Sequence, residues 1–310
     1  MKLQNFLSGA LTVFAVSALP PLPVDGAAAG LSSDWAEGHN SRVRLIAGKG
    51  LAGVELQMPK GWKTYWRNPG DAGGVPPSFD WSKSENLASA EVLYPAPERF
   101  TDRIGDTVGY KDTVVFPVRL EAKDPAKPIG LRLALDYGVC KEICIPAEAA
   151  LTLDITSDAP PIPQQLADAL GRVPRPASEK KLSDPSLKRV MLNLTGERPH
   201  IVLETKFPGG GVHADAFIEA PSGSYVPLPK MTADDGAGNV TFEVDLSSDV
   251  DVEDLNGHSL IVTLVSDEGQ SEVTFDIRLA ATLVSAYDGF LSGYSRSARS
   301  PALQREGMIG

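Results

Sequence analysis

Two cysteines, Cys140 and Cys144, are the only ones in the 310-residue chain, and three residues separate them. Before the pair, bulky apolar residues alternate with small or polar ones over residues 131–139, and this period of two predicts a half-buried strand. The same alternation over residues 145–155 predicts a second strand. With residues 141–143 as the turn, the pattern predicts a β-hairpin that carries the cysteines at its tip.

The hairpin decides whether the two cysteines can be joined. On one continuous strand, residues four apart would be separated by about 13 Å, which is too far for a disulfide. Opposite each other across a hairpin, their Cα atoms would lie roughly 4.5–5.5 Å apart, which a disulfide can span. The sequence therefore predicts a disulfide between Cys140 and Cys144.

The place of the cysteines in the alternation separates two interpretations of this disulfide. Both fall on the polar face of their strands, with Arg132, Asp136 and Glu148, whereas a disulfide that only staples a core more often lies on the apolar face. A disulfide that closes so small a loop also removes little entropy from the unfolded chain. These features favour an exchangeable, redox-active pair. A structural disulfide at a hairpin tip is the alternative.

The first 29 residues have the features of a secretory signal. Lys2 precedes a short apolar stretch over residues 7–19, and residues 27–29 are alanines that suit a cleavage site. The apolar stretch is too short for a good membrane span, and no later stretch approaches 18 apolar residues. We therefore expect a cleaved signal peptide over residues 1–29 and export to an oxidising compartment, where a disulfide persists.

Charge and histidine placement argue against several classes of ligand. A formal net charge of -11, without any run of Lys or Arg, argues against a nucleic-acid partner. His200, His213 and His258 are scattered and lack the spacing of metal ligands. We therefore expect neither a metal nor another cofactor.

The rest of the chain predicts an all-β protein of two domains. Short strand candidates between turn residues favour a β-sandwich over residues 30–157. A Pro-rich stretch over residues 158–186, with one short helix candidate at 163–170, predicts a semi-rigid linker. Six further strand candidates predict a second β-sandwich over residues 187–282, and residues 283–310 are predicted to be a mobile tail.

Two further segments of the first domain affect the functional interpretation. Residues 61–81 collect aromatic side chains that are either core residues or a stacking platform. Residues 95–105 predict a polar loop around Phe100, which either covers a site or anchors the loop in the core. Residues 110–120 predict one strand, with Pro117 indicating an edge position.

Three stretches together resemble one family. They are GWKTYWRNPGDAG at residues 61–73, YPAPERF at 94–100 and LDYGVCKEICIP at 135–146. These stretches are similar to the amino-terminal periplasmic domain of the DsbD/ScsB-type thiol:disulfide interchange reductases. The resemblance covers roughly residues 35–157, and the second β domain resembles more weakly the segment that follows in the ScsB-like branch.

The resemblance implies a fold and a set of site residues. The fold is immunoglobulin-like, and Cys140 and Cys144 are the redox pair. The neighbours that the resemblance implies are a cap around Glu98, Arg99 and Phe100, which shields the pair until a partner docks, and Tyr65 and Trp66 beside the pair.

The resemblance also implies a function in the periplasm. Proteins of this family take electrons from a membrane-embedded domain and pass them to thioredoxin-fold proteins, such as a disulfide isomerase or a cytochrome c maturation factor. This chain has no membrane domain, so we expect a separate membrane-embedded thiol reductase as the donor. We therefore expect a thiol:disulfide oxidoreductase that relays electrons. The alternatives are a non-enzymatic binding module with a structural hairpin disulfide, and a former reductase that now serves as an assembly factor.

Overall fold

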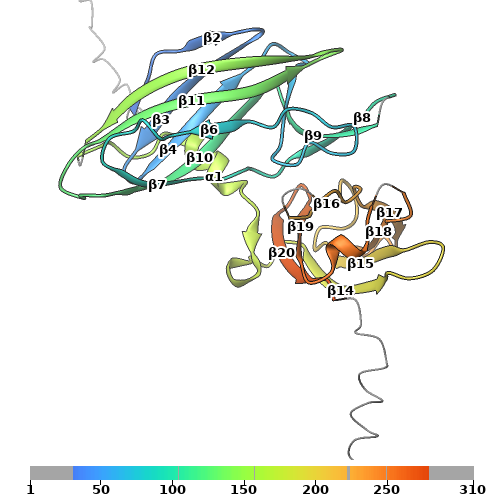
Figure 1. Ribbon diagram of the computed structural model, residues 1–310. Helices are drawn as coiled ribbons and strands as arrows, with labels where there is room; N and C mark the ends of the chain where they lie inside the picture. The colour runs from blue at the N-terminus through green and yellow to red at the C-terminus, as the bar shows by residue number, and fades with distance from the viewer. Residues whose placement is uncertain (1–30, 104, 157, 222–223, 249, 279–310) are drawn as a thin grey trace, which may run out of the picture.

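The computed structural model describes residues 31–278, apart from residues 104, 157, 222, 223 and 249. It contains two β-sandwiches, one above the other in Figure 1, so the predicted all-β class with two immunoglobulin-like sandwiches is confirmed. The predicted signal peptide and the predicted tail lie outside the described residues. Within the described part of the chain, no helix is long and apolar enough to cross a membrane.

The first sandwich is built from two six-stranded sheets. One sheet has the order β1 (Leu31–Ser32), β3 (Ser41–Gly48), β4 (Leu51–Gln57), β10 (Thr113–Ala122) and β7 (Leu87–Val92), with β2 (Ala36–Gly38) beside β3. The other has the order β12 (Cys144–Ile155), β11 (Ile129–Cys140), β5 (Lys63–Tyr65), β9 (Asp106–Lys111) and β8 (Glu98–Thr101), with β6 (Ser78–Asp80) beside β11.

The hairpin of β11 and β12 dominates the second of these sheets. Its two strands pair in register over their full length, from Ile129 opposite Ile155 to Cys140 opposite Cys144. The apolar residues that alternate along β11 are buried in the core between the sheets, as their period of two predicts. They are Leu131, Leu133, Leu135, Tyr137 and Val139.

The structure corrects the prediction of one continuous strand over residues 110–120. The chain leaves one sheet at Lys111 and enters the other at Thr113. Between them, Asp112 adopts the left-handed conformation with φ of 63°, which short polar side chains tolerate. Its carboxylate accepts a hydrogen bond from the backbone N–H of Gly61 at 2.6 Å, and this contact holds the crossover in place.

The prediction of an edge position for Pro117 is also wrong. Pro117 lies inside β10, which pairs with β4 on one side and β7 on the other. Its carbonyl accepts the N–H of Leu93, one residue beyond the end of β7. In an antiparallel pair the N–H and C=O of a residue face the same neighbour, so the missing proline N–H faces Leu93, where β7 has ended, and the ladder with β4 is unaffected.

The predicted linker, residues 158–186, packs against both sandwiches. Its helix α1 (Gln164–Gly171) buries Leu166 and Ala169 on the outer face of the first sheet. A Cβ atom on Gly53 of β4 would come within 2.7 Å of Leu166 Cδ1, so the glycine leaves room for the Leu166 side chain where the helix approaches the strand. Further along, β13 (Arg175–Pro176) pairs in parallel with β20 (Gln270–Asp276) of the second sandwich, and the short 3₁₀ turn η1 (Ala177–Glu179) follows.

The second sandwich is built from two four-stranded sheets with their own apolar core. One has the order β13, β20 (Gln270–Asp276), β19 (Ser259–Val265) and β16 (Asp215–Glu219). The other has the order β14 (Ser186–Asn193), β15 (His200–Lys206), β18 (Asn239–Asp245) and β17 (Lys230–Asp234). A 3₁₀ turn, η2 (Glu253–Leu255), precedes β19. The sequence does not predict β17, because every one of its residues is exposed and no apolar alternation marks it.

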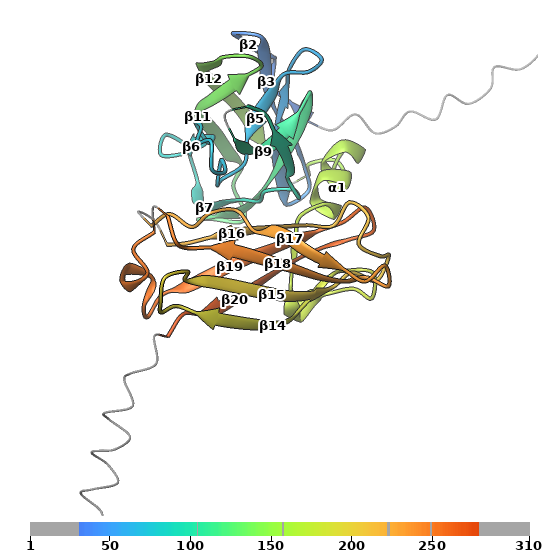
Figure 2. The same ribbon diagram turned by 90° about the vertical axis from the view of Figure 1, so that its right-hand side faces the viewer.

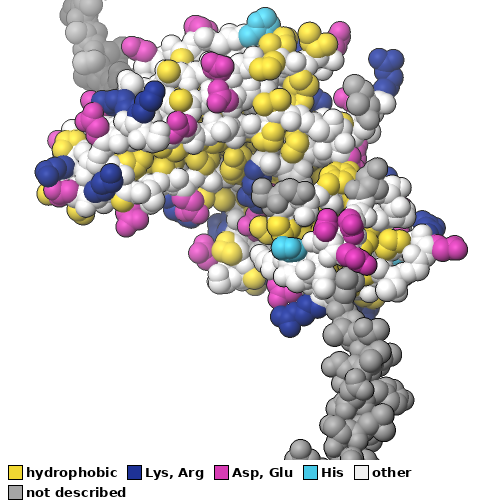
Figure 3. Space-filling view, in the orientation of Figure 1, with side chains coloured by type: hydrophobic (Ala, Val, Ile, Leu, Met, Phe, Trp, Pro, Cys, Tyr) yellow, Lys and Arg dark blue, Asp and Glu magenta, His cyan; other side chains and the backbone are white. Residues whose placement is uncertain are grey.

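The two sandwiches meet where the β8–β9 end of the first lies over the β16 side of the second (Figures 1 and 2). Phe217 of β16 and Leu228 belong to the same buried apolar cluster as the core of the first sandwich. On the face drawn in Figure 3, acidic and basic side chains are interspersed over both sandwiches.

Candidate functional site

The cysteines form a disulfide at the tip of the β11–β12 hairpin. Their Cα atoms are 4.2 Å apart, and the two residues are the last opposed pair of the hairpin. The two sulfurs differ in environment, since Cys140 is only 1% exposed whereas Cys144 is exposed. Ile143, in the turn between them, is 69% exposed. A reagent from solution therefore reaches the disulfide on its Cys144 side.

Cys140 is buried although it lies on the outer, polar face of its strand. The cover comes from β5, which pairs with the end of β11 and places Lys63 opposite Cys140. In the same register, Tyr65 lies beside Gly138, whose Cβ would come within 3.3 Å of Tyr65 Cε2. A Cβ on Gly74 would collide with the same ring. These glycines leave the space that the Tyr65 ring occupies on the outer face of the sheet.

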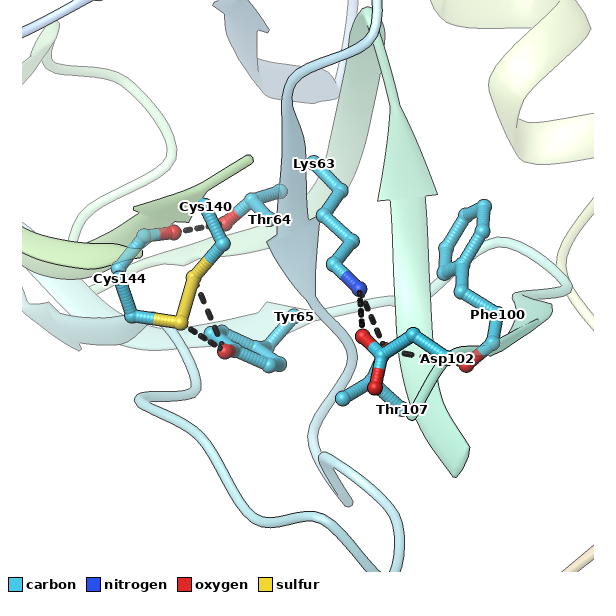
Figure 4. The surroundings of a disulfide bond; sticks show 9 residues. Lys63, Thr64, Tyr65, Phe100, Asp102, Thr107, Cys140 and Cys144 are labelled. Atoms are coloured by element: carbon cyan, nitrogen blue, oxygen red, sulfur yellow. Dashed lines mark hydrogen bonds and ion pairs between the residues drawn. A yellow bond between two sulfur atoms is a disulfide. The ribbon is translucent and has the colours of Figure 1, made fainter. Parts of the chain in front are cut away.

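The Tyr65 hydroxyl contacts both sulfurs. Its oxygen is 2.7 Å from Cys144 Sγ and 2.9 Å from Cys140 Sγ, as Figure 4 shows. A disulfide sulfur carries no hydrogen, so the hydroxyl is the donor in the oxidised protein. Burial, together with the nearby negative charge of Asp102, raises the pKa of the Tyr65 hydroxyl, which therefore keeps its proton at neutral pH.

A second polar group, centred on Lys63, lies on the other side of Tyr65. Lys63 Nζ donates a hydrogen bond to Thr107 Oγ1 at 2.8 Å and lies 3.7 Å from a carboxylate oxygen of Asp102. The ammonium group is also 5.4 Å from the centroid of the Phe100 ring. Lys63 therefore connects the strand beside the disulfide to the strand that carries Phe100 (Figure 4). Lys63 was not predicted as a site residue, although its spacing of two from Tyr65 puts both on one strand face.

Three other expected neighbours of the pair, Phe100, Glu98 and Trp66, lie in different environments. Phe100 lies on β8, with Lys63 between its ring and the disulfide (Figure 4). Glu98 begins β8 and is exposed. Trp66 is fully buried, and its ring packs against Phe217 of the second sandwich at a centroid distance of 5.6 Å. Among the expected neighbours of the pair, Tyr65 is the one whose side chain contacts the sulfurs.

The segment predicted as a polar loop, residues 95–105, contains the strand β8. Residues 98–101 pair with residues 106–109 of β9, so Phe100 is opposite Thr107 in an antiparallel pair. The sequence does not reveal this strand, because only four residues pair and two of them are charged or polar and exposed. Among the described residues, no group of three or more His, Cys, Asp or Glu side chains is arranged to hold a metal ion.

Comparisons with known proteins agree with the resemblance seen in the sequence. Residues 36–155 match the family model "Thiol:disulfide interchange protein DsbD, N-terminal". The solved N-terminal periplasmic domain of ScsB from Proteus mirabilis is similar in fold, with a TM-score of 0.61 and 24% sequence identity. That likeness covers 81% of this chain and 100% of the other, so it extends over both sandwiches. No curated protein matches the chain significantly.

Proposed function

Since residues 36–155 are a domain of the DsbD/ScsB amino-terminal type, we propose that this protein is a periplasmic thiol:disulfide interchange protein. In this proposal the Cys140–Cys144 pair relays electrons from a membrane-embedded thiol reductase to thioredoxin-fold acceptors. The observation that carries the proposal is the asymmetric disulfide, with one exposed sulfur, one buried sulfur and a tyrosine hydroxyl on both.

Re-reduction of the pair begins at the exposed sulfur. A thiolate of the donor attacks Cys144 Sγ, the bond between the two sulfurs breaks, and Cys140 leaves as a thiolate. The Tyr65 hydroxyl, already within hydrogen-bond distance of Cys140 Sγ, stabilises this leaving group. A second donor thiolate then attacks the donor sulfur of the mixed disulfide. This releases Cys144 as a thiolate and leaves the donor oxidised. Both cysteine thiolates take up a proton, and this protein is then a dithiol.

Transfer to the acceptor runs through the same atoms in the opposite direction. The Cys144 thiolate attacks a disulfide sulfur of the acceptor, whose other sulfur leaves and is protonated. Cys140 then attacks Cys144 Sγ and releases the acceptor as a dithiol, so that two electrons have moved. Lys63 and Tyr65 are the polar groups beside the buried thiol in this step. Phe100 and Glu98 remain, in the proposal, part of a cap that shields the pair until a partner docks.

The test is the reduction potential of the pair in the purified protein, measured by thiol trapping in a dithiothreitol or glutathione series. We expect a value in the range of exchange proteins, about -180 to -270 mV. A value below about -300 mV would identify a structural disulfide and favour the binding module instead. A Cys140→Ala variant should form a mixed disulfide with an acceptor and fail to release it, whereas repeated turnover by this variant would refute the relay.

A further inference from the structure

The second sandwich forms hydrogen bonds with two segments of the first sandwich that lie beside the redox site. One segment follows Tyr65 directly and comprises residues 66–71, and the other is β8, which carries Phe100 and leads to Asp102. Asn68 Nδ2 donates to the carbonyl of Ile218 at 2.9 Å. The carboxylate of Asp71 accepts hydrogen bonds from the Tyr225 hydroxyl and the Leu228 N–H, both at 2.9 Å.

Arg67 supplies an ionic contact in the first of these segments. Its guanidinium forms a bidentate pair with Glu219, at 2.7 to 3.0 Å, and a further contact with Glu272. It also lies 4.6 Å from the centroid of the Trp66 ring. Burial alone would lower the pKa of Arg67, but the two glutamates outweigh it and the pKa is raised. The charge is therefore held at the junction of the two sandwiches.

Arg99 makes the corresponding contact from β8. Its Nε and Nη2 bind the two carboxylate oxygens of Asp215 at 3.0 and 2.7 Å, and its Nη1 binds Asp106 of β9 at 3.0 Å. Nη2 also donates to the backbone carbonyls of Ala216 and Pro229, at 3.1 and 2.9 Å. One side chain, 16% exposed, thus ties β8 and β9 to two separate segments of the second sandwich.

The next residues along β8 reach the redox site. Phe100 and Asp102 contact Lys63, which is opposite Cys140 in the sheet. Asp102 lies three residues after Arg99, so the contact of Arg99 with the second sandwich lies in the same short segment as the contact of Asp102 with Lys63. The carboxylate offsets the charge of the Lys63 ammonium group, which on its own would favour both an approaching thiolate and a thiolate that forms on Cys140.

We propose that the second sandwich is a positioning element of the redox site, and that the Arg99–Asp215 pair restrains β8 and Asp102 and thereby slows attack on the disulfide by small thiols. This inference deepens the proposed function and rests on Cys140–Cys144 being the exchanging pair. Releasing β8 removes a fixed negative charge and a bulky neighbour from the same side of the site. Both changes should make the attack of small thiols on the disulfide faster.

The test compares Arg99→Ala and Asp215→Asn with the wild type. Arg189→Ala is the matched control, because Arg189 forms a bidentate pair with Glu204 within the second sandwich. The first readout is the second-order rate of disulfide reduction by dithiothreitol at pH 7. The second is hydrogen exchange of the amides of β8 and β9, with those of β10 as the internal reference. Asp215→Asn keeps the shape of the side chain, so it tests the same ion pair if Arg99→Ala folds poorly.

We expect both interface variants to be reduced about two- to tenfold faster than the wild type, the effect of one nearby charge near a protein surface. Exchange in β8 and β9 should accelerate about tenfold, without a change in β10. A rate of reduction that is unchanged or slower in the folded variants, or a change shared by Arg189→Ala, would overturn the inference. Because dithiothreitol replaces every protein partner, this result is independent of whether the protein relays electrons.

Discussion

At the scale of single residues, Tyr65 is the side chain whose chemistry the disulfide depends on most directly. Removing its hydroxyl in Tyr65→Phe leaves the ring between Gly74 and Gly138 but takes the hydrogen-bond donor away from both sulfurs. A hydrogen bond to a charged group is worth about 1.5–3 kcal/mol, so the Cys140 thiolate should form less readily. We expect reduction by dithiothreitol to slow by roughly ten- to a hundredfold.

Tyr137→Phe is the matched control for this prediction. The Tyr137 hydroxyl is also buried, but its partner is Ser41 Oγ at 2.8 Å. Its loss should cost about 1 kcal/mol of unfolding free energy and leave the rate of reduction unchanged. Equal rates for Tyr65→Phe and the wild type would remove the hydroxyl from the mechanism.

The unequal exposure of the two cysteines leads to a separate prediction. In Cys140→Ser the remaining thiol, Cys144, is exposed, whereas in Cys144→Ser the remaining thiol is the buried Cys140. We expect iodoacetamide to alkylate Cys140→Ser at least about tenfold faster than Cys144→Ser at pH 8, because access limits the second reaction. The rates can be followed by mass spectrometry. A faster reaction of Cys140 would reverse the assignment of Cys144 as the attacking residue.

The sequence locates the cysteines but not the network around them. Their hairpin follows from local alternation, and the resemblance brings in Tyr65. The ion pairs Lys63–Asp102 and Arg99–Asp215 were not predicted, because each joins segments about 40 residues or more apart in the sequence. Ionic contacts of this kind leave no periodic pattern in a single sequence.

At the scale of secondary-structure elements, α1 is the part of the interdomain segment that anchors it to the first sandwich. Leu166 is fully buried against β3, β4 and β10. Leu166→Ala should lower the unfolding free energy by about 2–5 kcal/mol, measured by urea denaturation. Leu182, in the same segment, is 99% exposed, so Leu182→Ala should change it by less than about 0.5 kcal/mol. Similar effects of the two substitutions would show that α1 is not docked in solution.

The other end of this segment is held by a buried ion pair between Arg175 and Asp184. The Asp184 side chain is fully buried, which by itself would raise its pKa, but Arg175 and the N–H of Lys181 outweigh burial and lower it. A lowered pKa in the folded state stabilises the protein above the pKa of the unfolded chain, and this stability is lost as the pH falls through the folded value. In the wild type, we expect the free energy of unfolding to decrease as the pH is lowered from about 4.

Asp184→Asn tests this pH dependence. The variant should be less stable than the wild type at pH 7, because it leaves the charge of Arg175 without its carboxylate. Its stability should also fall less steeply below about pH 4, because one of the titrating groups is gone. Urea denaturation at several pH values measures both effects. The same steepness in the variant and the wild type would assign the acid sensitivity to other carboxylates.

The elements themselves were predicted unevenly, for physical reasons. Strands with one buried and one exposed face, such as β11, β12 and β15, appear in the sequence as clear alternation. The three-residue strands β5 and β6 do not, because they are too short to show a period and lie among turn residues. The separation of β9 from β10 depends on the conformation of one residue, Asp112, which alternation of apolar residues does not indicate.

At the scale of the whole molecule, the apolar contact between the sandwiches decides whether they unfold together. Phe217 belongs to the second sandwich by sequence, but its fully buried ring packs on Trp66 in the cluster of the first. Arg99 lies 5.6 Å from the centroid of this ring, and Arg67 and Arg99 both form ion pairs with acidic residues of the second sandwich. An interface that shares an apolar core and charged pairs should couple the two unfolding reactions.

The positions of the tryptophans make this coupling measurable. All four, Trp35, Trp62, Trp66 and Trp81, lie in the first sandwich, so their fluorescence reports that sandwich, whereas far-UV circular dichroism reports both. In the wild type we expect the two signals to give one coincident urea transition. Phe217→Ala removes the shared ring, which should cost about 3–5 kcal/mol, and the two transitions should then separate. Separate transitions in the wild type, or coincident ones in Phe217→Ala, would contradict the coupling. Coupled unfolding would mean that a substitution in the second sandwich, or a partner bound to it, can change the stability of the segments beside the disulfide.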